Sequence, residues 1–163
     1  IFLSIYIGYS MGCAPIIGYH YGAGNKDELK NLFKKSLRII LVMSIVLTVA
    51  AEALARPLSM IFVSYDQELL EMTTYAFAVY SVSFLISGYN IYASSFFTAL
   101  NDGFTSALIS FCRTLIFEVI AVLVLPVLFG AYGIWYAVIT AEVFALMLSV
   151  FFLARNRKKY GYI

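Results

Sequence analysis

The sequence predicts an all-α membrane protein, a polytopic transmembrane helix bundle with four full helices and a partial one. Of its 163 residues, 63% are hydrophobic and only 12% are charged, whereas soluble domains are nearer half apolar and a quarter charged. The apolar residues also gather into runs of about 20 or more, the length that crosses the hydrocarbon layer of a bilayer. The excess apolar surface therefore requires a lipid bilayer as its partner.

Each apolar run is assigned to a helix, because only helices and closed barrels satisfy the backbone inside lipid. Barrel strands would be about ten residues long and strictly alternating, and these runs are neither. The expected helices cover residues 1–18 (in part), 36–60, 74–99, 105–128 and 133–154, with a tail over 155–163. They form a single transmembrane domain, and because the first run opens in mid-segment we expect a piece of a longer protein.

Basic residues lie at two places along the chain, and they predict its orientation. One group follows the first run and one follows the last: Lys26, Lys30, Lys34, Lys35 and Arg38, then Arg155, Arg157, Lys158 and Lys159. Four helices separate the groups, so both lie on one side, which the positive-inside rule makes cytoplasmic. We therefore expect a multi-pass plasma (inner) membrane protein with the GAGN loop, residues 22–25, and the C-terminus in the cytoplasm.

Aromatic residues are expected at the two membrane interfaces, where amphipathic rings are favoured. The outer set is Tyr65, Tyr132, Trp135 and Tyr136, and the inner set is Tyr160 and Tyr162. Tyr89 and Tyr92 lie one turn apart in the run 74–99. They have two interpretations: packing between helices, or an aromatic wall for a ligand.

Nothing in the sequence indicates an enzyme. It has no nucleophile elbow, no phosphate-binding loop and no metalloprotease motif, so no catalytic residue, metal or cofactor is expected. A net charge of +2 is too small to indicate a nucleic-acid partner. The glycines of GYHYGAGN instead predict a structural turn that ends a helix, with Pro15, Gly22, Gly24 and Asn25 as its residues.

Ionisable residues at membrane depth are the candidates for function, because a charge there is costly and usually faces a bundle interior or a wet cavity. Glu118 and Glu142 both lie roughly 17–18 Å from the expected cytoplasmic ends of their helices at 1.5 Å per residue. Two acids at one depth are typical of a proton- or cation-coupled site. Hydrogen bonding of either acid to a neighbouring helix is the open alternative.

Three further polar groups surround these acids in the expected bundle. Arg113 is shallower, at roughly 9 Å, and points about 140° away from Glu118, so the two should not pair directly. Asn90 opens a stripe with Ser94, Ser95 and Thr98 that suits either helix association or a wetted cavity wall. Glu52 and Arg56, spaced i and i+4, predict a structural salt bridge.

Two long stretches carry a family resemblance. MGCAPIIGYHYGAGNKDELKNLFKKSLR, residues 11–38, resembles the turn after the second helix of the C-terminal lobe in multidrug and toxic compound extrusion (MATE) transporters. Residues 94–137, from SSFFTALNDGF to YGIWYA, are similar to the fourth and fifth helices of that lobe.

The resemblance implies twelve helices in two six-helix lobes, with this chain as most of the C-terminal lobe and the N-terminal lobe as its partner. It implies antiport by alternating access, exporting small organic, mainly cationic, substrates against H⁺ or Na⁺. Some members carry a carboxylate in the tenth helix, but residues 74–99 contain no acid, so an ion site of that kind is not expected.

Two other functions stay open: a related flippase or exporter of lipid-linked oligosaccharides, and a non-transporting membrane subunit. A flippase for anionic lipid carriers needs several basic residues inside the membrane, and the sequence offers Arg113. The candidate pathway residues are Glu118, Glu142, Arg113, Asn90, Tyr89 and Tyr92.

Overall fold

The computed structural model describes residues 2–163, apart from the side chain of Ala131, and the described residues contain helices and no strand. The all-α prediction is confirmed. In chain order the elements are α1 (Phe2–Gly22), α2 (Lys26–Val63), α3 (Gln67–Val82), α4 (Phe84–Ala99), α5 (Gly103–Phe111), the π-helical segment η1 (Cys112–Phe117), α6 (Glu118–Phe129), the 3₁₀ segment η2 (Ala131–Tyr136) and α7 (Ala137–Tyr160).

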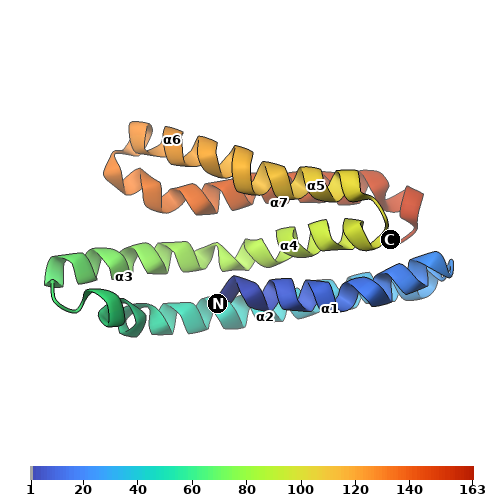
Figure 1. Cartoon of the computed structure of the whole chain (residues 1–163), viewed down its shortest axis with the longest axis horizontal. Helices are drawn as coiled ribbons and strands as arrows, with labels where there is room; N and C mark the ends of the chain where they lie inside the picture. The colour runs from blue at the N-terminus through green and yellow to red at the C-terminus, as the bar shows by residue number, and fades with distance from the viewer. Residues whose placement is uncertain (1) are drawn as a thin grey trace.

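The helices run side by side along one long axis (Figure 1). α1 and α2 form one layer, α3 and α4 follow each other through the middle, and α5, α6 and α7 form the opposite layer (Figure 1). α4 is the central helix, since it packs against α1, α2, α5 and α7. Polar residues on α4 are therefore placed where both outer layers can reach them.

Four helical stretches of the described chain are long and apolar enough to cross a membrane: Phe2–Gly22, Lys26–Val63, Gly103–Phe129 and Tyr132–Tyr160. α3 and α4 together form a fifth, bent by 46°. The bend falls at Ser83, whose backbone N–H bonds the carbonyl of Tyr80. The chain is thus a multi-pass membrane protein.

α2 begins ten residues before the expected start at residue 36. Asn25 caps it by accepting a hydrogen bond from the N–H of Glu28 (3.1 Å). Leu29, Phe33 and Ile40 are buried along one face, so the polar first turns are held by packing although they are not apolar overall. The five basic residues expected in a loop therefore lie on helix α2.

The 38 residues of α2 make a helix about 57 Å long, against about 30 Å for the hydrocarbon layer. α7 similarly continues to Tyr160, so that most of the expected tail is helical. At the other end of the bundle, α3 starts at Gln67 behind Asp66, which accepts from the N–H groups of Glu68 and Leu69. A prediction from hydropathy alone identifies the apolar part of each helix but not these amphipathic ends.

The C-terminal tyrosines, which are expected at the inner membrane interface, pack inside the end of the helix bundle. Tyr160 and Tyr162 are buried, and the Tyr162 ring packs on Phe33 and Phe96 at centroid distances of 5.1 and 4.9 Å. The Tyr160 hydroxyl donates to Asp102 (2.7 Å). Packing against other rings and a hydrogen bond from each hydroxyl therefore hold both side chains.

Asp102 joins α5 to this aromatic core. Burial raises the pKa of its carboxyl group, but the hydrogen bonds that it accepts from the Tyr160 hydroxyl and from Thr105, with Lys159 nearby, outweigh burial and leave the pKa below its ordinary value. The ionised carboxylate therefore ties the start of α5 to the end of α7.

Candidate functional site

A buried ion pair lies between α7 and the segment η1. The Arg113 guanidinium donates from Nη2 to Glu142 Oε1 at 2.6 Å and from Nε to both carboxylate oxygens at 2.9 and 3.1 Å. The side chains are 18% and 6% exposed. Such a two-pronged, charge-assisted contact is the strong form of an ion pair, and removing one partner at this depth strands the other charge.

The pairing differs from the expected one, in which Glu142 lay level with Glu118. Arg113 starts nearer the end of its helix, but its long side chain reaches the depth of Glu142. Arg113 also lies on the π-helical turn Cys112–Phe117, which changes the direction of side chains relative to a regular helix. As expected, Arg113 and Glu118 form no ion pair among the described residues.

Asn90 on α4 completes the buried group. Its amide nitrogen donates to the Glu142 side chain (2.7 Å) and backbone carbonyl (3.0 Å), and its oxygen accepts from Ser149 (3.0 Å). Asn90 is fully buried. The Arg113–Glu142–Asn90–Ser149 network, formed by these four residues, thus joins η1, α7 and α4, and its carboxylate is bonded from two sides.

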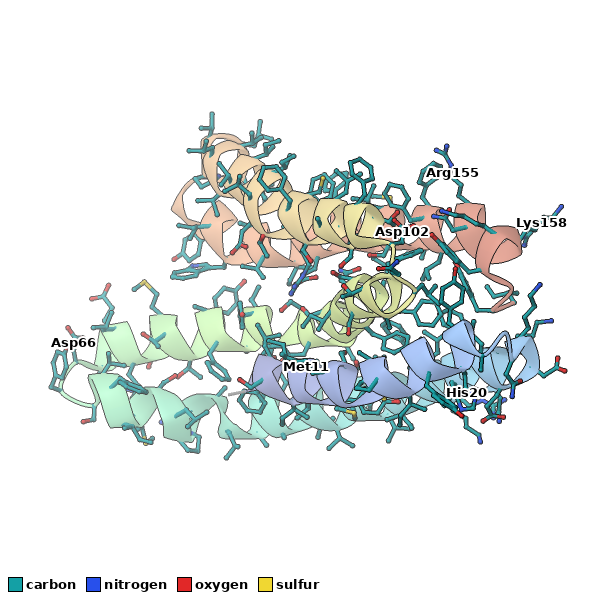
Figure 2. All side chains as sticks on the ribbon, turned by 45° about the vertical axis from the view of Figure 1, so that its right-hand side comes forward. Met11, His20, Asp66, Asp102, Arg155 and Lys158 are labelled. Atoms are coloured by element: carbon teal, nitrogen blue, oxygen red, sulfur yellow. The ribbon has the colours of Figure 1, made fainter. Side chains whose placement is uncertain are left out.

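An open cleft of about 680 Å³ lies next to this network. The α1 wall is mostly apolar, with Leu3, Ile7 and Met11, and the α4 floor carries Asn90, Ser94 and Thr98. Arg113 also lines the cleft, while Glu142 does not. Figure 2 shows the position of Met11 on α1. The cleft therefore has an apolar side and a hydrogen-bonding side, as sites for amphiphilic molecules do.

A ladder of hydroxyl groups forms the polar side. Ser94 on α4 is 2.9 Å from the Ser106 hydroxyl and 2.7 Å from that of Ser110. Thr98 is 2.7 Å from Ser106. These groups hold α4 against α5 at close range, as small polar residues do between membrane helices. Ser110 is exposed, so the ladder also meets the space of the cleft.

The other pathway candidates lie outside the cleft lining. Tyr92 is 1% exposed in an aromatic core with Phe33 and Phe96, and Tyr89 packs half-buried on the same core. Of the two interpretations open for these tyrosines, their contacts are those of packing between helices. Glu118 is half-buried at the start of α6.

Glu52 and Arg56 do not form the expected salt bridge: the ion pairs of the described chain are Arg113–Glu142 and Lys159–Asp102. Glu52 instead accepts a hydrogen bond from Ser81 on α3 at 2.5 Å. Ser81 is fully buried. A bond between helices thus takes the place of one along a helix face.

The structural-turn residues divide between a helix and the turn itself. Pro15 lies inside α1, which ends at Gly22. Gly24 adopts a left-handed conformation (φ +70°), where glycine is least strained, and Asn25 caps α2. The turn therefore consists of residues 23–25, and Pro15 lies two helical turns away.

Sequence reasoning missed the roles of Ser106, Ser110 and Ser149. Ser106 and Ser110 are four residues apart on one helix face, and Ser149 follows Glu142 by two turns, so the spacing that joins them to the site was visible. No group of three His, Cys, Asp or Glu side chains in the described residues could hold a metal ion.

A family model described as MatE matches residues 1–124 of the chain. The "Multidrug export protein MepA" of Staphylococcus aureus strains MSSA476 and MW2 is 28% identical over 153 residues, which is 91% of this chain and 33% of that protein. The protein of that name from strain bovine RF122 / ET3-1 is 26% identical over the same coverage. The chain spans about a third of the length of these curated relatives. No solved structure matches it.

Proposed function

This chain belongs to the MatE family, and we propose that it forms one lobe of a transporter that exports lipophilic organic compounds in exchange for H⁺ or Na⁺. The match to the family model confirms the resemblance that the sequence shows. The proposal extends to the complete protein, in which an N-terminal lobe would supply the opposite wall. Similarity to proteins named for multidrug export supports the substrate class.

One observation carries the proposal: a charged network joins helices that are apolar enough to span a membrane, and it lies beside an open amphiphilic cleft. Arg113 and Asn90 belong both to the network and to the cleft lining. A compound bound in the cleft can therefore change the hydrogen bonds that Glu142 accepts. Protonation of Glu142, or binding of a cation to it, can in turn change the positions of Arg113 and Asn90 in the cleft lining. This reciprocal dependence is what coupling two binding events requires, and transporter sites are typically found between such helices at the membrane midplane.

The proposed orientation has the α1–α2 turn and the end of α7 in the cytoplasm. Lys26 and Lys159 line one small pocket, so the two basic groups meet at one end of the bundle. Asp66 lies at the opposite end from Lys158 (Figure 2). The charge asymmetry along the axis supports placing the basic end inside the cell, in the plasma membrane.

The charge of the cleft separates this function from that of a flippase. A carrier of anionic lipid-linked sugars would need several cationic side chains, and among the described residues Arg113 alone brings a charge to the lining. That charge is paired with Glu142. We therefore retain drug export as the function of the cleft.

Glu142→Gln and Glu118→Gln, each made in the complete protein, test the proposal. We expect Glu142→Gln to reduce efflux of a fluorescent drug at least about tenfold at unchanged expression, the effect of one lost charge-assisted hydrogen bond. Glu118→Gln should also reduce efflux if this acid carries the coupling ion. The assay follows substrate-driven dye efflux from cells or vesicles under an H⁺ or Na⁺ gradient.

Glu52→Gln provides the matched control, since Glu52 is another membrane-depth acid but contacts Ser81 away from the cleft. Its efflux should equal that of the wild type. Wild-type efflux by both Glu142→Gln and Glu118→Gln would remove the two acids from the mechanism. Absence of gradient-driven efflux of any compound by the wild-type protein would favour a non-transporting subunit.

A further inference from the structure

The charge that meets the cleft is positive, because Arg113 lines it and the acid that pairs with Arg113 does not. No Asp or Glu side chain of the described residues is in the lining. An organic cation in the cleft would therefore meet hydroxyl groups, an amide and a guanidinium, with the carboxylate of Glu142 behind them. This wall is poorly suited to the cationic part of a substrate.

Arg113 retains free hydrogen-bonding capacity. A guanidinium has five N–H groups, and the contacts with Glu142 use the Nε–H and one N–H of Nη2. The remaining three, two of them on Nη1, have no acceptor among the described residues. A planar edge with parallel N–H groups matches a carboxylate in two-pronged geometry.

The lining of the cleft, to which Arg113 belongs, favours an amphiphilic ligand. Ser94 and Ser110 supply hydroxyl groups on the same side of the cleft, while Ile7 and Met11 supply the apolar wall opposite. Glu142 offsets the formal charge of Arg113, so a carboxylate would be bound mainly through directed hydrogen bonds. An apolar ring system with one carboxylate or strongly polarised carbonyl fits both sides.

We propose that Arg113 makes this lobe selective for the carboxylate end of an amphiphilic substrate. Anionic or zwitterionic aromatic compounds should therefore bind better than the same compounds with the carboxylate esterified, a change that leaves a zwitterion purely cationic. This inference rests on the proposed function, because it takes the cleft to be the substrate site. It assigns the cationic part of a zwitterion to residues outside this cleft.

A rhodamine with a free carboxylate and its methyl ester test the inference, since they share one ring system and differ at a single carboxyl group. Dissociation constants are measured by fluorescence polarisation with the purified complete protein in lipid nanodiscs. We expect the carboxylate form to bind at least about tenfold more tightly than the ester, the effect of one charge-assisted hydrogen bond. Tighter binding of the carboxylate form by the wild-type protein is the first requirement of the inference.

The double variant Arg113→Gln/Glu142→Gln exchanges the ion pair for two amides that can bond each other, which avoids an unpaired buried charge. We expect the preference for the carboxylate form to fall to near unity in this variant. The control makes the same exchange at Arg56 and Glu52, which lie on α2 outside the cleft lining, and should keep the wild-type ratio.

Equal binding of the two dyes by the wild type, tighter binding of the ester, or a preference that survives the double exchange would each overturn the inference while leaving the export function in place. Failure of the wild-type protein to bind or export either dye would instead count against the proposed function, and the inference would fall with it.

Discussion

Glu142→Ala is expected to lower the free energy of unfolding of the complete protein by about 3–5 kcal/mol, the usual effect of stranding one partner of a buried ion pair. The substitution removes the acceptor of all three hydrogen bonds from Arg113 and leaves the Asn90 amide nitrogen with the backbone carbonyl alone. Thermal or denaturant unfolding in detergent micelles measures the change. No other single substitution considered for this chain should cost as much.

A double variant separates the charge effect from the loss of packing. Arg113→Leu/Glu142→Leu removes both charges and fills similar volume, and replacing a whole buried pair by apolar side chains is often neutral. We expect it to be more stable than Glu142→Ala. If Glu142→Ala unfolds within about 1 kcal/mol of the wild type, the pair contributes no more than an exposed ion pair does, and its description as a strong, two-pronged contact is wrong.

Gly88→Ala is expected to cost about 1–3 kcal/mol, the range for overfilling a packed core. A Cβ atom at Gly88 would lie 2.6 Å from Tyr6 Cε1 and 3.0 Å from Ile40 Cγ2. Tyr6 is not free to move away, because its hydroxyl donates to the Phe84 carbonyl at 2.9 Å and bonds Ser44 at 3.1 Å. α1 would therefore have to separate from α4, which also widens the cleft between them.

Gly8→Ala is the matched control for this prediction. It lies on α1, and a Cβ atom there would meet nothing within 4 Å, so alanine should be neutral or slightly stabilising in the helix. Both variants are compared by their melting temperature in the same detergent. Equal melting temperatures for Gly88→Ala and the wild type would contradict the close α1–α4 contact.

The helical spans were predictable because hydrophobicity over 20 residues is a physical requirement of the bilayer. The first turns of α2 were not predictable in this way, because Leu29 and Phe33 are buried on one face of the helix while lysines occupy the other face. The packing of Tyr162 was not predictable for a related reason. Its burial depends on rings brought from α2 and α4, which are distant in sequence.

Three of the four members of the candidate network were predicted from the sequence, but Ser149 and the pairing were not. The depth along each helix identified Arg113, Glu142 and Asn90 as candidates, because a polar group inside the bilayer costs free energy and usually faces a bundle interior or a wet cavity. Which of them touch depends on side-chain reach, on the order in which helices pack around α4, and on the π-helical turn at Cys112–Phe117. None of these three is encoded in the hydropathy of a single helix.

Water access to the cleft tests the central claim that the Arg113–Glu142 network borders a solvated passage. The measurement is the labelling rate of Ser110→Cys by a membrane-impermeant maleimide, in a background without native cysteines. Ser110 lines the cleft and its neighbour Phe111, also exposed, does not, so Phe111→Cys is the control at equal depth. We expect Ser110→Cys to react at least about tenfold faster, because the thiolate forms only where water reaches it. Labelling of Ser110→Cys as slow as that of Phe111→Cys would mean that the cleft is dry and sealed, and would contradict the account.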